Sequence, residues 1–130
     1  MKKHLILLIL TFVCSITVAS SAYAASKWEG TSTNLKGDFR YGKVSFTLEG
    51  KTIKNFIVEG VTTSGCGNYK SVVVPKMKVK GNKFSAYYTP IPGINDVIIV
   101  TGTIKGNSAS GTFSEGPLCS NSGKFKAKKK

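Results

Sequence analysis

The chain has 130 residues, with 19 lysines and arginines against 6 aspartates and glutamates, a formal net charge of +13. A chain of this length holds one domain with one modest core, and its positive charge favours anionic partners. The only histidine is His4. Beyond the first residues, therefore, the sequence excludes Ser-His and Cys-His nucleophilic sites and histidine metal ligands.

Residues 1–24 have the layout of a secretory signal peptide. A short basic start precedes an apolar run over residues 5–13, and small residues lead to Ala22-Tyr23-Ala24. This pattern predicts cleavage after Ala24. The apolar run is shorter than the roughly 20 residues that a membrane span requires. We therefore expect a secreted or periplasmic domain, residues 25–130, with no stable membrane anchor after cleavage.

The charge of the expected domain indicates which partners it would attract. Residues 25–130 carry 17 basic and 6 acidic side chains, a balance of +11. In the cell envelope, the anionic partners are phosphate-bearing polymers, acidic glycans and lipid head groups; the alternative is that the charge serves solubility alone. Nucleic acid would suit the lysines and aromatic residues, but an exported chain rarely meets it. We expect a monomer.

Alternating apolar and polar residues after Trp28 predict an all-β domain, and no stretch there is typical of a helix. About eight short strands follow one another, mostly through tight turns. They lie within the segments "KVSFTLEG", "TIKNFIVEG", "KSVVVPKMKVKGNKFSAYYT", "DVIIVTGTIKGNSASGTFSEG" and "SGKFKAK", after a first strand near Trp28. Sequential hairpins favour an antiparallel meander that forms a small barrel or a sandwich.

Local signals within these strands predict specific features. Gly81-Asn82 and Gly106-Asn107 are two-residue hairpin signals. The alternation slips at Lys54-Asn55, which indicates a β-bulge. Pro75 marks an edge, a bend or a break between two short strands. The basic residues 127–130 at the C-terminus are expected to form a frayed, solvated tail.

The apolar residues of the alternating pattern define a candidate core. At this size we expect side chains to fill it rather than leave it hollow. The core residues expected are Trp28, Val44, Phe46, Leu48, Ile53, Phe56, Val58, Met77, Val79, Phe84, Ile98, Val100, Ile104, Phe113 and Phe125.

Two cysteines, Cys66 and Cys119, remain after the expected cleavage, and both lie in segments rich in glycine, serine and asparagine. An even pair of cysteines in an exported chain predicts one disulfide. The alternatives are free or intermolecularly paired thiols, a metal site or a nucleophile. A catalytic thiol needs a base, and only Lys70 is close in sequence; two thiols are too few for a metal.

The order of these motifs resembles a class of small exported bacterial β-domains. The resemblance rests on Trp-x-Gly at 28–30, "VSFTLEGKTIKNFIV", Cys66, "KGNKFS", "VTGTIKGNSASGTF", Cys119 and "SGKFKA". It covers nearly all of residues 25–130 and consists mainly of turn glycines and core positions. It implies an antiparallel β-domain tied by a disulfide, with no known catalytic set. Lipocalins, by comparison, carry Gly-x-Trp near their first strand, the reverse of the order here.

Lysines form the clearest candidate site. Lys76, Lys78 and Lys80 share one face of a strand, and Lys83 continues beyond the turn. Lys124 and Lys126, followed by Lys128, form a second row. On neighbouring strands, the two rows would make a basic patch for a polyanion. Alternatively, they are solvated strand faces that discourage edge pairing.

Two segments with aromatic residues are candidate partner-binding loops. Phe39, Arg40 and Tyr41 lie in a loop bounded by glycines, which suits stacking on sugars or on a partner protein. Alternatively, Phe39 or Tyr41 closes the end of the barrel. In residues 85–96, Tyr87 and Tyr88 fall on opposite faces of a strand, so only one of them is available for binding.

The sequence favours an exported, non-catalytic binding or interaction module that contacts an anionic envelope polymer or another protein. The alternative is a small inhibitor-type protein that engages an enzyme through its aromatic loops. No activated nucleophile, metal set or cofactor motif is evident, and the spacing of the six carboxylates singles out no pair for acid-base chemistry. We therefore expect no enzyme activity and no cofactor.

Overall fold

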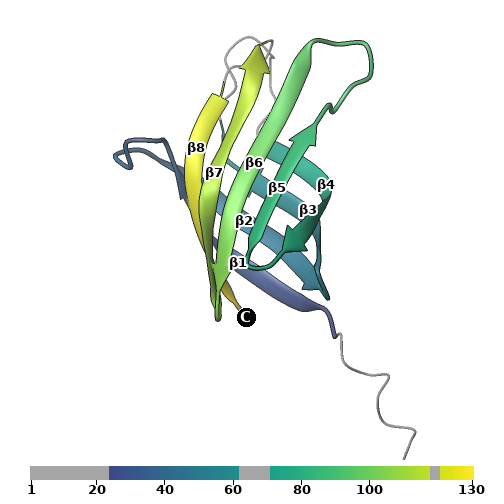
Figure 1. The fold of residues 1–130 in the computed structure, drawn as a ribbon. Helices are drawn as coiled ribbons and strands as arrows, with labels where there is room; N and C mark the ends of the chain where they lie inside the picture. The colour runs from purple at the N-terminus through teal and green to yellow at the C-terminus, as the bar shows by residue number, and fades with distance from the viewer. Residues whose placement is uncertain (1–23, 62–70, 118–120) are drawn as a thin grey trace, which may run out of the picture.

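The structure is a computed structural model that describes residues 24–61, 71–117 and 121–130. The described chain consists of eight β-strands joined in sequence (Figure 1). They are β1 (Ser26–Thr33), β2 (Arg40–Glu49), β3 (Thr52–Glu59), β4 (Ser71–Lys80), β5 (Lys83–Tyr88), β6 (Asp96–Lys105), β7 (Ser108–Pro117) and β8 (Asn121–Lys129).

The strands close into a barrel. Each strand pairs antiparallel with the next, and β8 returns to pair with β1 through contacts such as Gly30 with Ala127. The all-β meander is therefore confirmed, and of the two closures considered, the barrel is the one formed. Within the described ranges, no helix is long and apolar enough to cross a membrane.

Aromatic and branched side chains fill the barrel, as expected for its size. The residues predicted for the core are buried, except Leu48 and Ile104, which are half-buried and pack against it. The rings of Trp28 and Phe46 stack with centroids 5.6 Å apart, and Phe56 meets Phe125 edge-on at 5.1 Å. The core also contains residues that the alternation had not singled out: Val61, Val72, Val74, Ala109 and Ala127.

The predicted turns and bulge are present. Gly81 and Gly106, with φ angles of 63° and 58°, form the corners between β4 and β5 and between β6 and β7. The β2–β3 pairing slips between Ser45 and Thr47, opposite Asn55, whose φ is 55°. The bulge returns the next apolar residue of β3, Phe56, to the core.

Pro75 lies within one continuous strand, so the predicted break into two strands is wrong. The predicted edge position is close to the observed one, as the strand pairing shows. β4 pairs with β3 from Ser71 to Lys78, whereas its pairing with β5 is confined to residues 78–80. Pro75 therefore lies in a stretch of β4 that has no β5 partner. A residue without a backbone N–H is tolerated at such a position.

The expected frayed tail at residues 127–130 is wrong, because the last residues belong to the closing strand. Ala127 is buried, and the β1 and β7 ladders hold β8 from both sides. The Lys130 N–H donates to the Lys27 carbonyl at 2.9 Å. Lys128 and Lys129 are therefore exposed residues of β8, and Lys130 follows directly after it.

Candidate functional site

The two lysine rows lie on the outside of the barrel, but on strands that are not neighbours. Lys76, Lys78 and Lys80 are exposed on β4, and Lys124 and Lys126 are exposed on β8. Strands β5, β6 and β7 separate them. The patch expected from adjacent rows is therefore replaced by a broader surface, with a lysine row at each side.

The strand registers connect the two lysine rows through continuous cross-strand rows. The first cross-strand row is Lys78, Ser85, Thr101, Thr112 and Lys124. The second is Lys80, Lys83, Thr103, Ser110 and Lys126. Each row begins with a lysine on β4 and ends with a lysine on β8, four strand spacings or about 19 Å away along the sheet.

Hydroxyl groups occupy the middle of this surface. The five residues between the lysines, here named the hydroxyl band, are Ser85, Thr101, Thr103, Ser110 and Thr112. Two of them are in contact, because Thr101 Oγ1 and Thr112 Oγ1 share a hydrogen bond at 3.0 Å. Hydroxyls donate to anionic oxygens and also accept from sugar or polyol hydroxyls. We call the hydroxyl band and the flanking Lys76, Lys78, Lys80, Lys83, Lys124 and Lys126 the basic face.

The basic face is hollowed rather than flat. A hollow of about 1030 Å³ extends from the lysines of β4 to Ser110 and Thr112 of β7. A second hollow, of about 490 Å³, continues from Ser110 and Thr112 to Lys124 and Lys126. Because they share lining residues, the two hollows form one path across the face.

The lining of the large hollow includes two glycines that lie on neighbouring strands. Gly102 of β6 lies opposite Gly111 of β7, and both line the large hollow. A Cβ on Gly102 would lie 2.2 Å from Phe84 Cζ, and one on Gly111 would lie 2.0 Å from the Thr101 carbonyl oxygen. The backbones at these two glycines thus approach the core rings closely.

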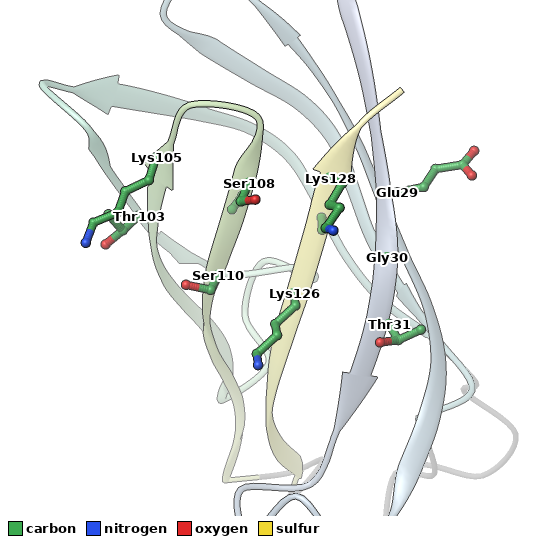
Figure 2. A pocket seen from close by; sticks show the side chains of 11 residues that line it. Glu29, Gly30, Thr31, Thr103, Lys105, Ser108, Ser110, Lys126 and Lys128 are labelled. Atoms are coloured by element: carbon green, nitrogen blue, oxygen red, sulfur yellow. The ribbon is translucent and has the colours of Figure 1, made fainter.

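A third hollow, of about 650 Å³, adjoins the basic face where β6, β7, β8 and β1 lie side by side (Figure 2). Lys126 and Lys128 project there beside Ser110 and Ser108. The acidic residue of the lining, Glu29, points away from the two lysines. Lys105 extends this hollow with a further cation.

Glu29 is held by cations outside the basic face. Its carboxylate pairs with Lys130 Nζ at 3.1 Å and with Lys43 Nζ at 3.3 Å. The hydrogen bond from Lys130, followed by that from Lys43, lowers the pKa of Glu29 below its usual value. No carboxylate is among the residues that line the two hollows of the basic face. The lysines there face solvent without a carboxylate in the lining.

The structure separates the three residues of the candidate partner-binding loop. Phe39 and Arg40 are exposed, whereas Tyr41 is half-buried and donates from its hydroxyl to the Ser122 carbonyl at 2.9 Å. Tyr41 also packs against Phe113, with ring centroids 6.2 Å apart. Tyr41 is therefore packed into the barrel wall, whereas the alternative interpretation of the sequence had Phe39 or Tyr41 closing the barrel end.

The next pair of aromatic residues divides as expected. Tyr87 is 76% exposed, whereas Tyr88 packs against the core. Tyr87 also lines the large hollow, beside Lys76 and Lys78. It adds an aromatic surface to the β4 side of the basic face.

Cys66 and Cys119 lie outside the described residues, so their disulfide remains a prediction. Within residues 24–61, 71–117 and 121–130, no group of three His, Cys, Asp or Glu side chains is placed to hold a metal ion.

Sequence reasoning missed a carboxyl pair at one end of the barrel. Asp96, on β6, is 4% exposed, and its side chain is hydrogen-bonded to that of Glu115 on β7. Burial, this hydrogen bond and the charge of Asp96 raise the pKa of Glu115 to about 7. Asn121 lies opposite Glu115, and its buried Nδ2 has no hydrogen-bond partner among the residues that the structure describes.

The hydroxyl band was also missed, although the sequence held the signal for both features. The hairpin corner at Gly106-Asn107 sets the register of the two strands. In that register Thr103 is paired with Ser110, and Asp96 and Glu115 lie on the same face. Both features could have been predicted by following this hairpin register along the full length of the two strands.

No protein-family model matches the chain, and a search of curated proteins gives no significant match.

Proposed function

We propose that this protein is an exported, non-catalytic binding module that holds an anionic envelope polymer across its basic face. The observation that carries the proposal is the register of β4 to β8. It connects a lysine at each side through hydroxyl-bearing residues in two successive cross-strand rows. A solubility charge requires no such order, because lysines scattered over any surface would serve equally well.

The chemistry of the basic face indicates the ligand class. Lysine ammonium groups act as point charges for phosphate, sulfate or carboxylate groups, and the hydroxyls between them can bind neutral oxygens of the same chain. A polymer that alternates charged groups with polyol or sugar units matches both features. The exposed Tyr87 offers a surface on which a sugar ring can pack.

The test measures retention on an immobilised polyanion as a function of salt. The probes are polyphosphate and dextran sulfate. Because the attraction is ionic, affinity should fall steeply as salt rises. Lys80→Gln/Lys126→Gln removes one cation from each side of the basic face and should reduce both the affinity and its salt dependence.

The matched control removes the same charge elsewhere. Lys27 and Lys129 are exposed and do not line the hollows of the basic face. Lys27→Gln/Lys129→Gln should therefore retain nearly full binding. Equal losses in the two double variants would mean that only net charge matters, and the basic face would not be a site. Salt-insensitive binding, or none, would also reject the proposal.

A further inference from the structure

The loop between β1 and β2 carries two exposed apolar side chains. Leu35 is 54% exposed and Phe39 is 57% exposed. The loop extends away from the barrel wall rather than folding over it (Figure 1). Most exposed apolar residues of this chain lie on strands or in the long connection after β5, so two of them on one short projecting loop form a distinct feature.

The side chain of Asn34 holds the loop in one conformation. Asn34 Oδ1 accepts hydrogen bonds from the backbone N–H groups of Gly37, Asp38 and Phe39 at 2.9, 3.1 and 3.2 Å. The Asn34 N–H donates to the Phe39 carbonyl at 2.9 Å, which closes the base of the loop. A loop already ordered by its own hydrogen bonds loses little further conformational entropy when it binds.

Phe39 is supported from below. Its ring meets Tyr41 edge-on with centroids 5.7 Å apart, and Tyr41 is fixed to β8 through the Ser122 carbonyl. More than half of the Phe39 side chain nevertheless remains exposed to solvent. The ring is thus presented outward on an anchored base.

Three cations lie on the loop or close to it. Lys36 and Arg40 are exposed on the loop and at its end. Lys124 lies beneath the loop, since its Nζ would be 3.4 Å from a Cβ built on Gly37. The acidic residue here, Asp38, accepts a hydrogen bond from Asn34 Nδ2. The loop therefore carries two exposed apolar side chains together with two exposed cations, and a third cation lies near Gly37.

We infer that the loop, residues 34–40, docks on an anionic lipid bilayer surface. Leu35 and Phe39 enter the boundary between head groups and acyl chains, while Lys36, Arg40 and Lys124 contact the lipid phosphates. Apolar and aromatic side chains flanked by lysine and arginine are the combination that binds at membrane interfaces. The charge complementarity with anionic head groups selects this occupant. This surface adjoins the basic face, with which it shares Lys124, but Leu35 and Phe39 line neither of its two hollows, and the inference goes beyond the proposed polymer binding.

The test is partition of the whole protein onto lipid vesicles of two compositions. One contains phosphatidylcholine alone, and the other contains phosphatidylcholine with phosphatidylglycerol. The protein should bind the second and much less to the first. Leu35→Ser/Phe39→Ser should reduce binding about tenfold, because it removes the inserted apolar surface. Ile91→Ser, which removes another exposed apolar side chain, should leave vesicle binding unchanged.

A spectroscopic measurement separates insertion from adsorption by charge. In Phe39→Trp, the new indole should shift its emission to shorter wavelength on phosphatidylglycerol vesicles and be quenched by brominated lipid. Trp28 is 2% exposed in the core, so its own emission should stay constant. Vesicle binding that neither shifts this emission nor weakens in Leu35→Ser/Phe39→Ser would overturn the inference.

Polyphosphate binding distinguishes the two proposals. Leu35→Ser/Phe39→Ser should bind polyphosphate as the unchanged protein does, which also shows that the variant is folded. Retention of polyphosphate without vesicle binding would overturn the lipid inference and leave the polymer proposal standing. Vesicle binding sensitive to Leu35 and Phe39, without polyphosphate binding, would reject the polymer proposal and support the lipid inference.

Discussion

The side chains of Asp96 and Glu115 are hydrogen-bonded to each other at one end of the barrel, where burial and this contact raise the pKa of Glu115. Burial is the main cause of the raised pKa of Glu115, and the hydrogen bond and charge of Asp96 add to it. Folding thus favours the protonated carboxyl of Glu115.

The first prediction is that stability falls as pH rises. The pKa of Glu115 increases from 4.5, its ordinary value, to about 7 in the folded protein. Its contribution to the free energy of unfolding is therefore complete below pH 4.5 and is lost as pH rises through about 7. Since Glu115 is only half-buried, we expect a loss of about 1–2 kcal/mol, measured by urea unfolding across this range.

Glu115→Gln provides the check. The amide keeps a donor toward Asp96 but does not titrate, so the fall in the free energy of unfolding between pH 4.5 and about 7 should disappear. Glu59→Gln, at an exposed position, is the control and should keep the full dependence. An unchanged pH profile in Glu115→Gln would show that another group is responsible.

The carboxyl pair illustrates how far the sequence leads. The alternation of apolar residues such as Val44 and Phe46 with polar ones predicts the strands, and the Gly-Asn pairs predict the hairpins. Alternation and turn residues are both local properties of the chain. The inward position of Asp96 follows from the same register, but alternation by itself treats a charged residue as outward-facing. Here the hydrogen bond with the neighbouring carboxyl of Glu115 helps to make the burial tolerable.

Closure and the basic face depend on information that is not local. The pairing of β1 with β8 joins the two ends of the described chain, and no short stretch of sequence specifies it. The lysine rows were visible in the sequence, but their separation by three strands was not. Consequently the sequence predicts the residues of the site better than their arrangement.

The second prediction concerns the glycine pair beneath the basic face. In Gly102→Ala, the new Cβ would collide with Phe84, whose ring packs between Phe46 and Phe125 at centroid distances of 6.3 and 6.2 Å. The ring cannot retreat, so we expect a loss of about 1–3 kcal/mol in the free energy of unfolding. Thermal and urea unfolding measure it.

A matched glycine and a second-site change test the cause of that loss. A Cβ on Gly116 would meet no heavy atom of the described residues within 4 Å, so Gly116→Ala should have little effect. In the Phe84→Leu background, Gly102→Ala should cost less free energy of unfolding than it does in the unchanged protein, since the smaller side chain leaves room for the new Cβ. Additive losses would show that the collision with Phe84 is not the cause.

The third prediction separates the roles of neighbouring aromatic residues. Tyr41→Phe removes the hydroxyl that bonds to the Ser122 carbonyl and should cost about 0.5–1.5 kcal/mol. Its binding to polyphosphate should not change. Phe39→Ala, at an exposed position, should leave the free energy of unfolding nearly unchanged. If the two effects on stability were exchanged, the assignment of Tyr41 to the barrel wall would be wrong.

The fourth prediction concerns the C-terminal residues 127–130. They are the end of β8 and the residue that follows it, rather than a frayed tail. Deleting them removes the buried Ala127, the end of both ladders and the Lys130 bond to Lys27. We expect a loss of roughly 2–4 kcal/mol in the free energy of unfolding, because several hydrogen bonds and apolar surface are lost together.

The control for that deletion removes charge but keeps the strand. Lys128→Gln/Lys129→Gln retains the backbone pairing of β8 with β1 and β7, so its unfolding midpoint in urea should stay close to that of the unchanged protein. A solvated tail would give the opposite pattern, in which deletion and neutralisation are both nearly harmless. Because β8 is the strand that closes the barrel, its last pairs with β1 should contribute to the stability of the whole fold.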